Sequence, residues 1–133
     1  MEISEQHAGK ITIVEIKGRL DSNMARPFAE RLTSLINAGH VRLVVDFKHI
    51  EYITSAGFRA LLVADQLAKR INGTVALCSL PDDVRRLFEI GGFTDLFPIY
   101  ATREEAVAKL SAQHVVDLWV ERTDRQSDAA GDR

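Results

Sequence analysis

Apolar residues along the chain follow two periods, and the alternation between them predicts an α/β fold. Runs rich in β-branched residues predict strands, and segments with apolar residues at helical spacing lie between these runs. The predicted strands are residues 11–17, 41–47, 74–78 and 97–100, with Ile3 on a further strand before them. The predicted helices begin near Met24, Ser55, Asp82 and Thr102. This order favours a mixed, partly parallel sheet of four to five strands with about four helices packed against it.

The boundaries of these elements are predicted from cap-forming residues, glycine and proline. Residues 18–23 are expected to form a turn, with Pro27 in the first turn of the helix that follows, where a missing N–H costs least. Residues 48–52 are expected to connect the second strand to its helix. The inner face of the third helix is expected to carry Val84, Leu87, Phe88 and Ile90.

The length of 133 residues fits one folded domain, predicted over residues 1–112, and a C-terminal extension over residues 113–133 that is expected to be partly disordered. A hydrophobic content of 46% is enough for a core, and a net charge of −2 argues against a nucleic-acid or membrane partner. No apolar run approaches the ~20 residues that span a bilayer, and no signal peptide is recognisable. The single cysteine, Cys78, lies in an apolar run and is predicted to be buried. Cytoplasmic localisation is expected.

The segment from Val44 to Arg59 contains the most informative residues. A buried strand leads into a helix that starts at Thr54 and Ser55, and the Ser55 hydroxyl is a suitable N-cap. Gly57 follows inside the first turn, where glycine costs about 1 kcal/mol relative to alanine. We interpret that cost as a sign of close approach by another chain.

A helix start can also hold added negative charge, because its N–H groups and dipole favour anions. Phosphorylation of Ser55 would add about −1.5 to −2 charges without unfolding the domain, and a partner docking over Gly57 would meet that charge. A serine at this position is also an ordinary cap. Spacing alone leaves both interpretations open.

The same segment resembles the signature of the STAS domain family, in which a strand ending in aspartate and an apolar residue is followed by Ser-small-Gly-apolar at a helix start. Here these positions are Asp46-Phe47 and Ser55-Ala56-Gly57-Phe58. Residues 18–21 resemble the family's turn after the second strand, and residues 84–93 resemble its third helix and exit. The resemblance covers roughly residues 8–112 and implies a single STAS domain.

Within the family, the chain is similar to the bacterial anti-sigma factor antagonists. That resemblance implies a partner that is both an anti-sigma factor and a serine kinase of the ATPase-fold type, phosphorylation that ends binding, and a serine phosphatase that restores it. By position, Ser55 is the phosphoacceptor. Thr54, which stands where aspartate is frequent, is a competing acceptor. The implied partner-binding residues are Asp21, Asp46, Thr54, Ser55, Ala56, Gly57 and Phe58.

Several alternatives remain beside this interpretation. Asp21 and Asp46 could be a turn residue and a solvated strand end, and Phe58 could be a core residue or an exposed anchor. Trp119 could pack on the domain, pair with a second copy in a weak homodimer or lie in a mobile extension. No catalytic group, metal site or cofactor motif is indicated, and the histidines lack ligand spacing (His7, His40, His49 and His114). The alternative function is a STAS-type accessory subunit that binds a transporter ATPase without phosphorylation, and an enzyme is a third, weaker hypothesis.

Overall fold

A five-stranded mixed sheet with the order β1-β2-β3-β4-β5 forms the centre of the protein, whose computed structural model describes residues 2–112. The strands are β1 (Glu2–Ala8), β2 (Ile11–Leu20), β3 (Arg42–Ile53), β4 (Thr74–Cys78) and β5 (Ile99–Tyr100). Strand β1 is antiparallel to β2, and the other neighbouring pairs are parallel. The predicted mixed sheet is therefore confirmed.

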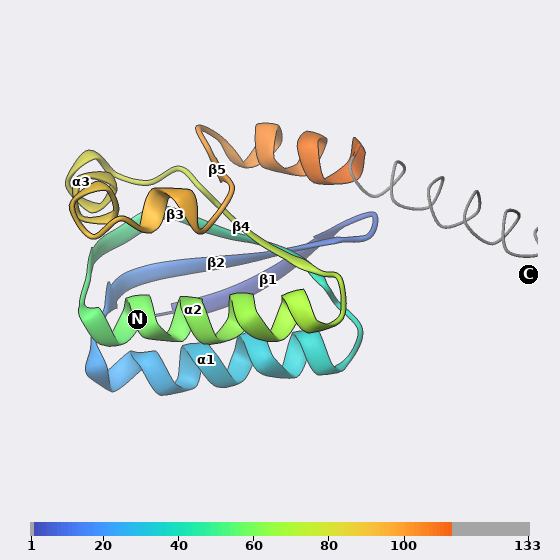
Figure 1. The fold of residues 1–133 in the computed structure, drawn as a ribbon, viewed down its shortest axis with the longest axis horizontal. Coiled ribbons are helices and arrows are strands. Elements are labelled where there is room, and N and C mark those ends of the chain that lie inside the picture. The colour runs from blue at the N-terminus through green and yellow to red at the C-terminus, as the bar shows by residue number, and fades with distance from the viewer. Residues whose placement is uncertain (1, 113–133) are drawn as a thin grey trace, which may run out of the picture.

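Helices cover both faces of this sheet. The helices are α1 (Ser22–Asn37), α2 (Ser55–Arg70), α3 (Asp82–Ile90), the 3-10 helix η1 (Phe93–Asp95) and a last helix over residues 103–112. Helices α1 and α2 run side by side along one face, and the last helix lies on the opposite side of the strands (Figure 1). We call the face covered by α1 and α2 the first face and the other the second face.

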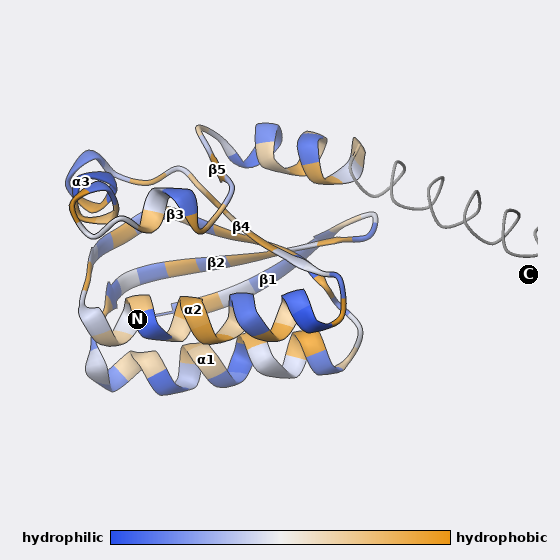
Figure 2. Ribbon diagram, viewed as in Figure 1, coloured by the Kyte–Doolittle hydropathy of each residue, from blue (hydrophilic) through white to orange (hydrophobic). Residues whose placement is uncertain are grey.

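The main core lies on the first face. Alternation along β3 directs Leu43, Val45 and Phe47 toward the helices, where they join Phe28 of α1 and Leu61 of α2. Strands β2, β3 and β4 are largely apolar and the helices carry polar residues between apolar ones (Figure 2), as expected for strands buried between helices. The edge strand β1 is mostly polar and exposed.

A smaller core lies on the second face. Ala106 and Leu110 of the last helix are buried in one cluster with Ile11, Ile13, Val44, Ala76 and Cys78. Cys78 is fully buried, which confirms the prediction from sequence.

Two predicted connections are in fact strand. β2 continues through Gly18, which adopts a φ of 106°, to Leu20, and β3 continues to Ile53. Leu20 and Ile53 pair at the ends of the two strands and are both buried, so hydrophobic burial extends the ladder through segments that looked like turns.

Two helix predictions were also wrong. Helix α1 begins at Ser22, which places Pro27 beyond the first turn. On α3 only Val84 and Phe88 are buried, whereas Leu87 is 43% and Ile90 75% exposed. A nine-residue helix at the border of the sheet buries one narrow stripe, and Leu87 and Ile90 lie outside it.

Candidate functional site

The carboxyl ends of β2 and β3 bring two helix starts to the same edge of the sheet. The strands are parallel neighbours, and Leu20 pairs with Ile53 at their last positions. Helix α1 follows β2 directly and α2 follows β3, so Asp21 and the segment from Thr54 lie at neighbouring helix starts. Figure 1 shows both helices starting at the same end of the domain.

Asp21 is the N-cap of α1. Its carboxylate Oδ1 accepts hydrogen bonds from the backbone N–H of Asn23 at 3.1 Å and of Met24 at 3.2 Å. The carboxylate thus gives the Asn23 N–H an acceptor at the start of the helix, and it shares the Met24 N–H with the Asp21 carbonyl oxygen, which lies 3.1 Å from that nitrogen. Asp21 is therefore a cap placed beside the start of α2.

Replacing this cap gives a first prediction. We expect Asp21→Ala to lower the free energy of unfolding by about 1 kcal/mol, because the first-turn N–H groups lose their acceptor. Asp21→Asn is the matched control and should stay close to the parent, since asparagine caps about as well as aspartate. Urea denaturation followed by circular dichroism measures both. Equal losses in the two variants would contradict the capping role.

Helix α2 begins differently from the prediction. The N-cap is Thr54, and Ser55 is the first helical residue. The Thr54 hydroxyl donates a hydrogen bond to the carbonyl oxygen of Leu20 at 3.3 Å. The same oxygen also accepts a hydrogen bond from the Thr54 N–H at 3.0 Å. Thr54 therefore ties α2 to β2, and no side chain in the described part of the chain caps the first turn of α2. Ser55 itself is exposed.

Gly57 is buried, and its close neighbours belong to the same chain. A Cβ atom at this position would lie 2.7 Å from Ile53 Cγ1, 2.8 Å from the Leu20 carbonyl oxygen and 2.9 Å from Leu20 Cγ. Close packing within the chain is therefore enough to explain this glycine, and the approach of another chain stays a prediction. The glycine lets the first turn of α2 lie directly on the ends of β2 and β3.

Phe58 packs at the border of the main core, and its role as an anchor for a partner stays a prediction. It is half-buried, stacks on Phe93 with ring centroids 4.7 Å apart and meets Phe88 edge to face at 4.8 Å. These contacts join the first turn of α2 to η1 and α3. The exposed part of the ring lies on the same turn of α2 as the half-buried Ala56 and the exposed Ser55.

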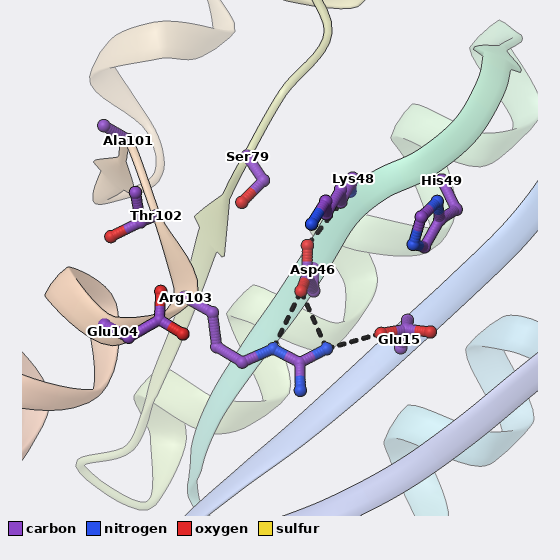
Figure 3. Close-up of a pocket in the computed structure, with 9 residues that line it drawn as sticks. All are labelled: Glu15, Asp46, Lys48, His49, Ser79, Ala101, Thr102, Arg103 and Glu104. Carbon is purple, nitrogen blue, oxygen red and sulfur yellow. Dashed lines mark hydrogen bonds and ion pairs between the residues drawn. The ribbon is translucent and has the colours of Figure 1, made fainter.

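Asp46 lies away from this edge, on the second face, and it is not a solvated strand end. Its side chain is buried and accepts hydrogen bonds from the backbone N–H of Lys48 at 3.0 Å and from Arg103 Nε at 2.8 Å. Arg103 also donates to Glu15, as Figure 3 shows. The structure does not bring Asp46 together with Ser55, because α2 covers the first face.

Sequence reasoning missed the Arg103 cluster, which we define as Gln6, Glu15, Asp46 and Arg103. Burial by itself lowers the pKa of Arg103, but hydrogen bonds and charges, first of Asp46 and then of Glu15, outweigh it and raise the pKa above its usual value. The cluster borders a cavity of about 540 Å³ that Lys48 and His49 also line. The capping box at residues 102–105 was the available signal, because it places residue 103 at a helix start.

Within residues 2–112, no three His, Cys, Asp or Glu side chains are grouped so that they could hold a metal ion. No helix in that part of the chain is both long and apolar enough to cross a bilayer.

Comparison with known proteins identifies the family. Residues 2–106 match the STAS domain family. The chain is 32% identical to BtrV of Bordetella bronchiseptica, provisionally named an anti-sigma factor antagonist, over 81% of this chain and 93% of BtrV. It is 30% identical to the anti-sigma-B factor antagonist of Bacillus subtilis, over 71% of this chain and 85% of that protein.

The fold agrees with this assignment. A Thermotoga maritima crystal structure, provisionally described as an anti-sigma factor antagonist, superimposes with a TM-score of 0.77 at 18% identity and covers 80% of this chain and 92% of its own. The chain therefore belongs to the STAS domain family and, within it, to the anti-sigma factor antagonists.

Proposed function

We propose that this protein binds an anti-sigma factor that is also a serine kinase, and that phosphorylation of Ser55 ends the interaction. The observation that carries the proposal is the exposed Ser55 hydroxyl at the first position of α2, a helix without a side-chain cap. The proposed domain is residues 1–112, and the proposed role is protein binding without catalysis. The names of the two relatives support an anti-sigma factor as the partner.

The start of α2 suits a reversible phosphate. The first-turn N–H groups have no intrahelical acceptor, so they can donate hydrogen bonds to phosphate oxygens, and the helix dipole adds attraction. The kinase and the phosphatase of the proposed circuit would reach Ser55 without unfolding the domain, because the side chain is exposed.

The neighbouring Asp21 explains how one phosphate could prevent binding. Its carboxylate already places one negative charge at the start of α1, and phosphorylation would raise the local charge to about −2.5 to −3. A partner surface that fits the unmodified edge would have to desolvate this charge. The proposed partner surface comprises Asp21, Thr54, Ser55, Ala56 and the exposed part of Phe58, with Gly57 buried beneath it. Asp46 is buried on the second face and lies outside this surface.

Charge substitution at Ser55 tests the proposal. We expect Ser55→Asp to weaken binding to the anti-sigma factor of the native host at least about tenfold, which corresponds to about 1.4 kcal/mol, while the fold is unchanged. Ser55→Ala should bind like the parent and accept no phosphate. Isothermal titration calorimetry and mass spectrometry after incubation with ATP and the kinase give the two measurements.

Two controls make the result specific. Ser34→Asp adds the same charge at an exposed position near the other end of α1 and should leave the affinity unchanged. Thr54→Val keeps Ser55 and removes the competing hydroxyl, so phosphate should still be incorporated. Equal affinity of Ser55→Asp and the parent would refute the charge switch. Capture of a transporter ATPase from the host, with Ser55 unmodified, would support the accessory-subunit alternative.

A further inference from the structure

The last helix covers the second face with a small apolar footprint. In the part that the structure describes, residues 103–112, only Ala106, Val107 and Leu110 pack against the apolar cluster of the sheet. Burial of so few side chains contributes little compared with the first face, where two long helices pack. A segment with few buried apolar contacts has a low free energy of local opening.

Arg103, at the start of this helix, supplies the strong polar contacts. The guanidinium bonds Gln6 of β1 at 2.8 Å, Glu15 of β2, and Asp46 of β3 at 2.8 Å. One side chain of the last helix thus reaches three adjacent strands. Figure 3 shows its contacts with Glu15 and Asp46. Charge-assisted hydrogen bonds of this kind are about twice as strong as neutral ones.

Glu15 and Asp46 lie so close together that their arrangement depends on the positive charge of Arg103. Glu15 and Asp46 are direct neighbours in the β2–β3 register. Like charges placed opposite each other across a ladder are destabilising, and Arg103 neutralises one of them. The Arg103 and Glu15 side chains are 22% and 26% exposed, whereas that of Asp46 is 3% exposed. Solvent therefore reaches the Arg103–Glu15 contact, while Asp46 is shielded from it.

We propose that the helix over residues 103–112 is a lid that opens while the rest of the domain stays folded, and that Arg103 controls how often it opens. Opening hydrates the Arg103 cluster and uncovers the second face. The proposal does not depend on phosphorylation of Ser55, which lies on α2 on the first face.

Cys78 provides a built-in reporter of this opening. It is the single cysteine of the chain and is buried beneath the lid, in the same cluster as Ala106 and Leu110. Burial, and next the charge of Asp46, raises its pKa to about 12, so the closed form holds very little reactive thiolate at pH 8. While the rest of the domain stays folded, reaction of Cys78 therefore requires that the lid opens.

The test measures the rate at which the disulfide reagent DTNB modifies Cys78 in the full chain at pH 8. The urea concentration is varied from 0 M to the onset of unfolding. Opening of the lid exposes little surface, so the modification rate should be nearly independent of urea at low concentrations. It should also exceed the rate expected if Cys78 reacted only in the globally unfolded chain. A rate that rises with urea as steeply as the global unfolding equilibrium, or that never exceeds it, would overturn the proposal.

A matched pair of variants tests the role of Arg103. Arg103→Met should accelerate modification about 10- to 100-fold, whereas Arg86→Met, the same change at an exposed position of α3, should leave the rate unchanged. Glu15→Gln keeps the hydrogen-bond acceptor, removes one charge and should give a smaller acceleration. An unchanged rate in Arg103→Met would show that the cluster does not hold the lid, and the urea profile of the parent stands as a test even where a variant fails to fold.

Discussion

Replacing Gly57 by leucine is expected to destabilise the whole domain by at least about 3 kcal/mol, rather than to leave a folded protein with an obstructed surface. The new Cβ atom would fall within 2.9 Å of Leu20 Cγ and within 2.8 Å of the Leu20 carbonyl oxygen. That oxygen cannot move away easily, because it accepts two hydrogen bonds from Thr54. The remainder of the leucine side chain has even less room.

The free energy of unfolding of Gly57→Leu, measured by urea denaturation, checks this expectation. Gln66→Leu places the same side chain at an exposed position of the same helix and should change stability by no more than about 0.5 kcal/mol. Gly57→Ala should lie between the two, because about 1 kcal/mol of helix propensity partly offsets the overlap. A midpoint for Gly57→Leu equal to that of the parent would show that the turn of α2 does not lie on β2 and β3 as described.

This result bears directly on the proposed function. A loss of partner binding in a Gly57 variant could come from a damaged fold rather than from a blocked interface. Substitutions at Ser55 and Ala56 test the surface more cleanly, since those side chains are exposed or half-buried.

Replacing Phe88 by alanine is expected to lower the free energy of unfolding by about 3–5 kcal/mol, the range for deleting a buried phenylalanine ring. Phe88 is fully buried. Its ring meets Phe58 at 4.8 Å, Phe47 at 6.1 Å, Phe93 at 6.3 Å and Phe97 at 6.4 Å, each edge to face. Pairs of this geometry add about 0.5–1.5 kcal/mol to the stabilisation from burial.

Urea denaturation again provides the measurement, and Leu87→Ala is the control on the same helix. Leu87 is 43% exposed, so its truncation should cost well under half as much. Because Phe88 supports Phe58, its loss should also loosen the first turn of α2, and near-ultraviolet circular dichroism of the aromatic residues should report this. Similar losses for the two variants would mean that the aromatic cluster is not a centre of the core.

The periodicity of the sequence was sufficient for most of the secondary structure. Strand β4 occupies the predicted residues 74–78, and α3 and the last helix begin near the predicted caps. Local signals were reliable here because turn chemistry and hydrophobic spacing act within one element. The Thr102 hydroxyl, for example, accepts from the Glu105 N–H at 3.1 Å, as the capping box predicted.

Errors arose wherever a contact with a distant element outweighed the local preference. Residues 18–20 fall in the predicted turn and residues 48–52 were predicted to be a connection, but Gly18 pairs with Ile50 and Arg19 with Tyr52 across β2 and β3. The N-cap of α2 is Thr54 and not the predicted Ser55, and the Thr54 hydroxyl bonds the Leu20 carbonyl oxygen on the neighbouring strand. Sequence separations of more than 30 residues hide such partners from any local pattern.

The same distinction between local patterns and distant contacts applies to the candidate site. The amino-acid sequence alone was enough to locate the Ser55 segment and to indicate the family, since that signature is a short local motif at a strand-to-helix junction. The neighbourhood of Asp21, the inward role of Gly57 and the burial of Asp46 against Arg103 depend on which strands become neighbours. Pairing of β2 with β3 puts two helix starts at one edge and two acids on one face, because parallel strands align their carboxyl ends and alternate their side chains.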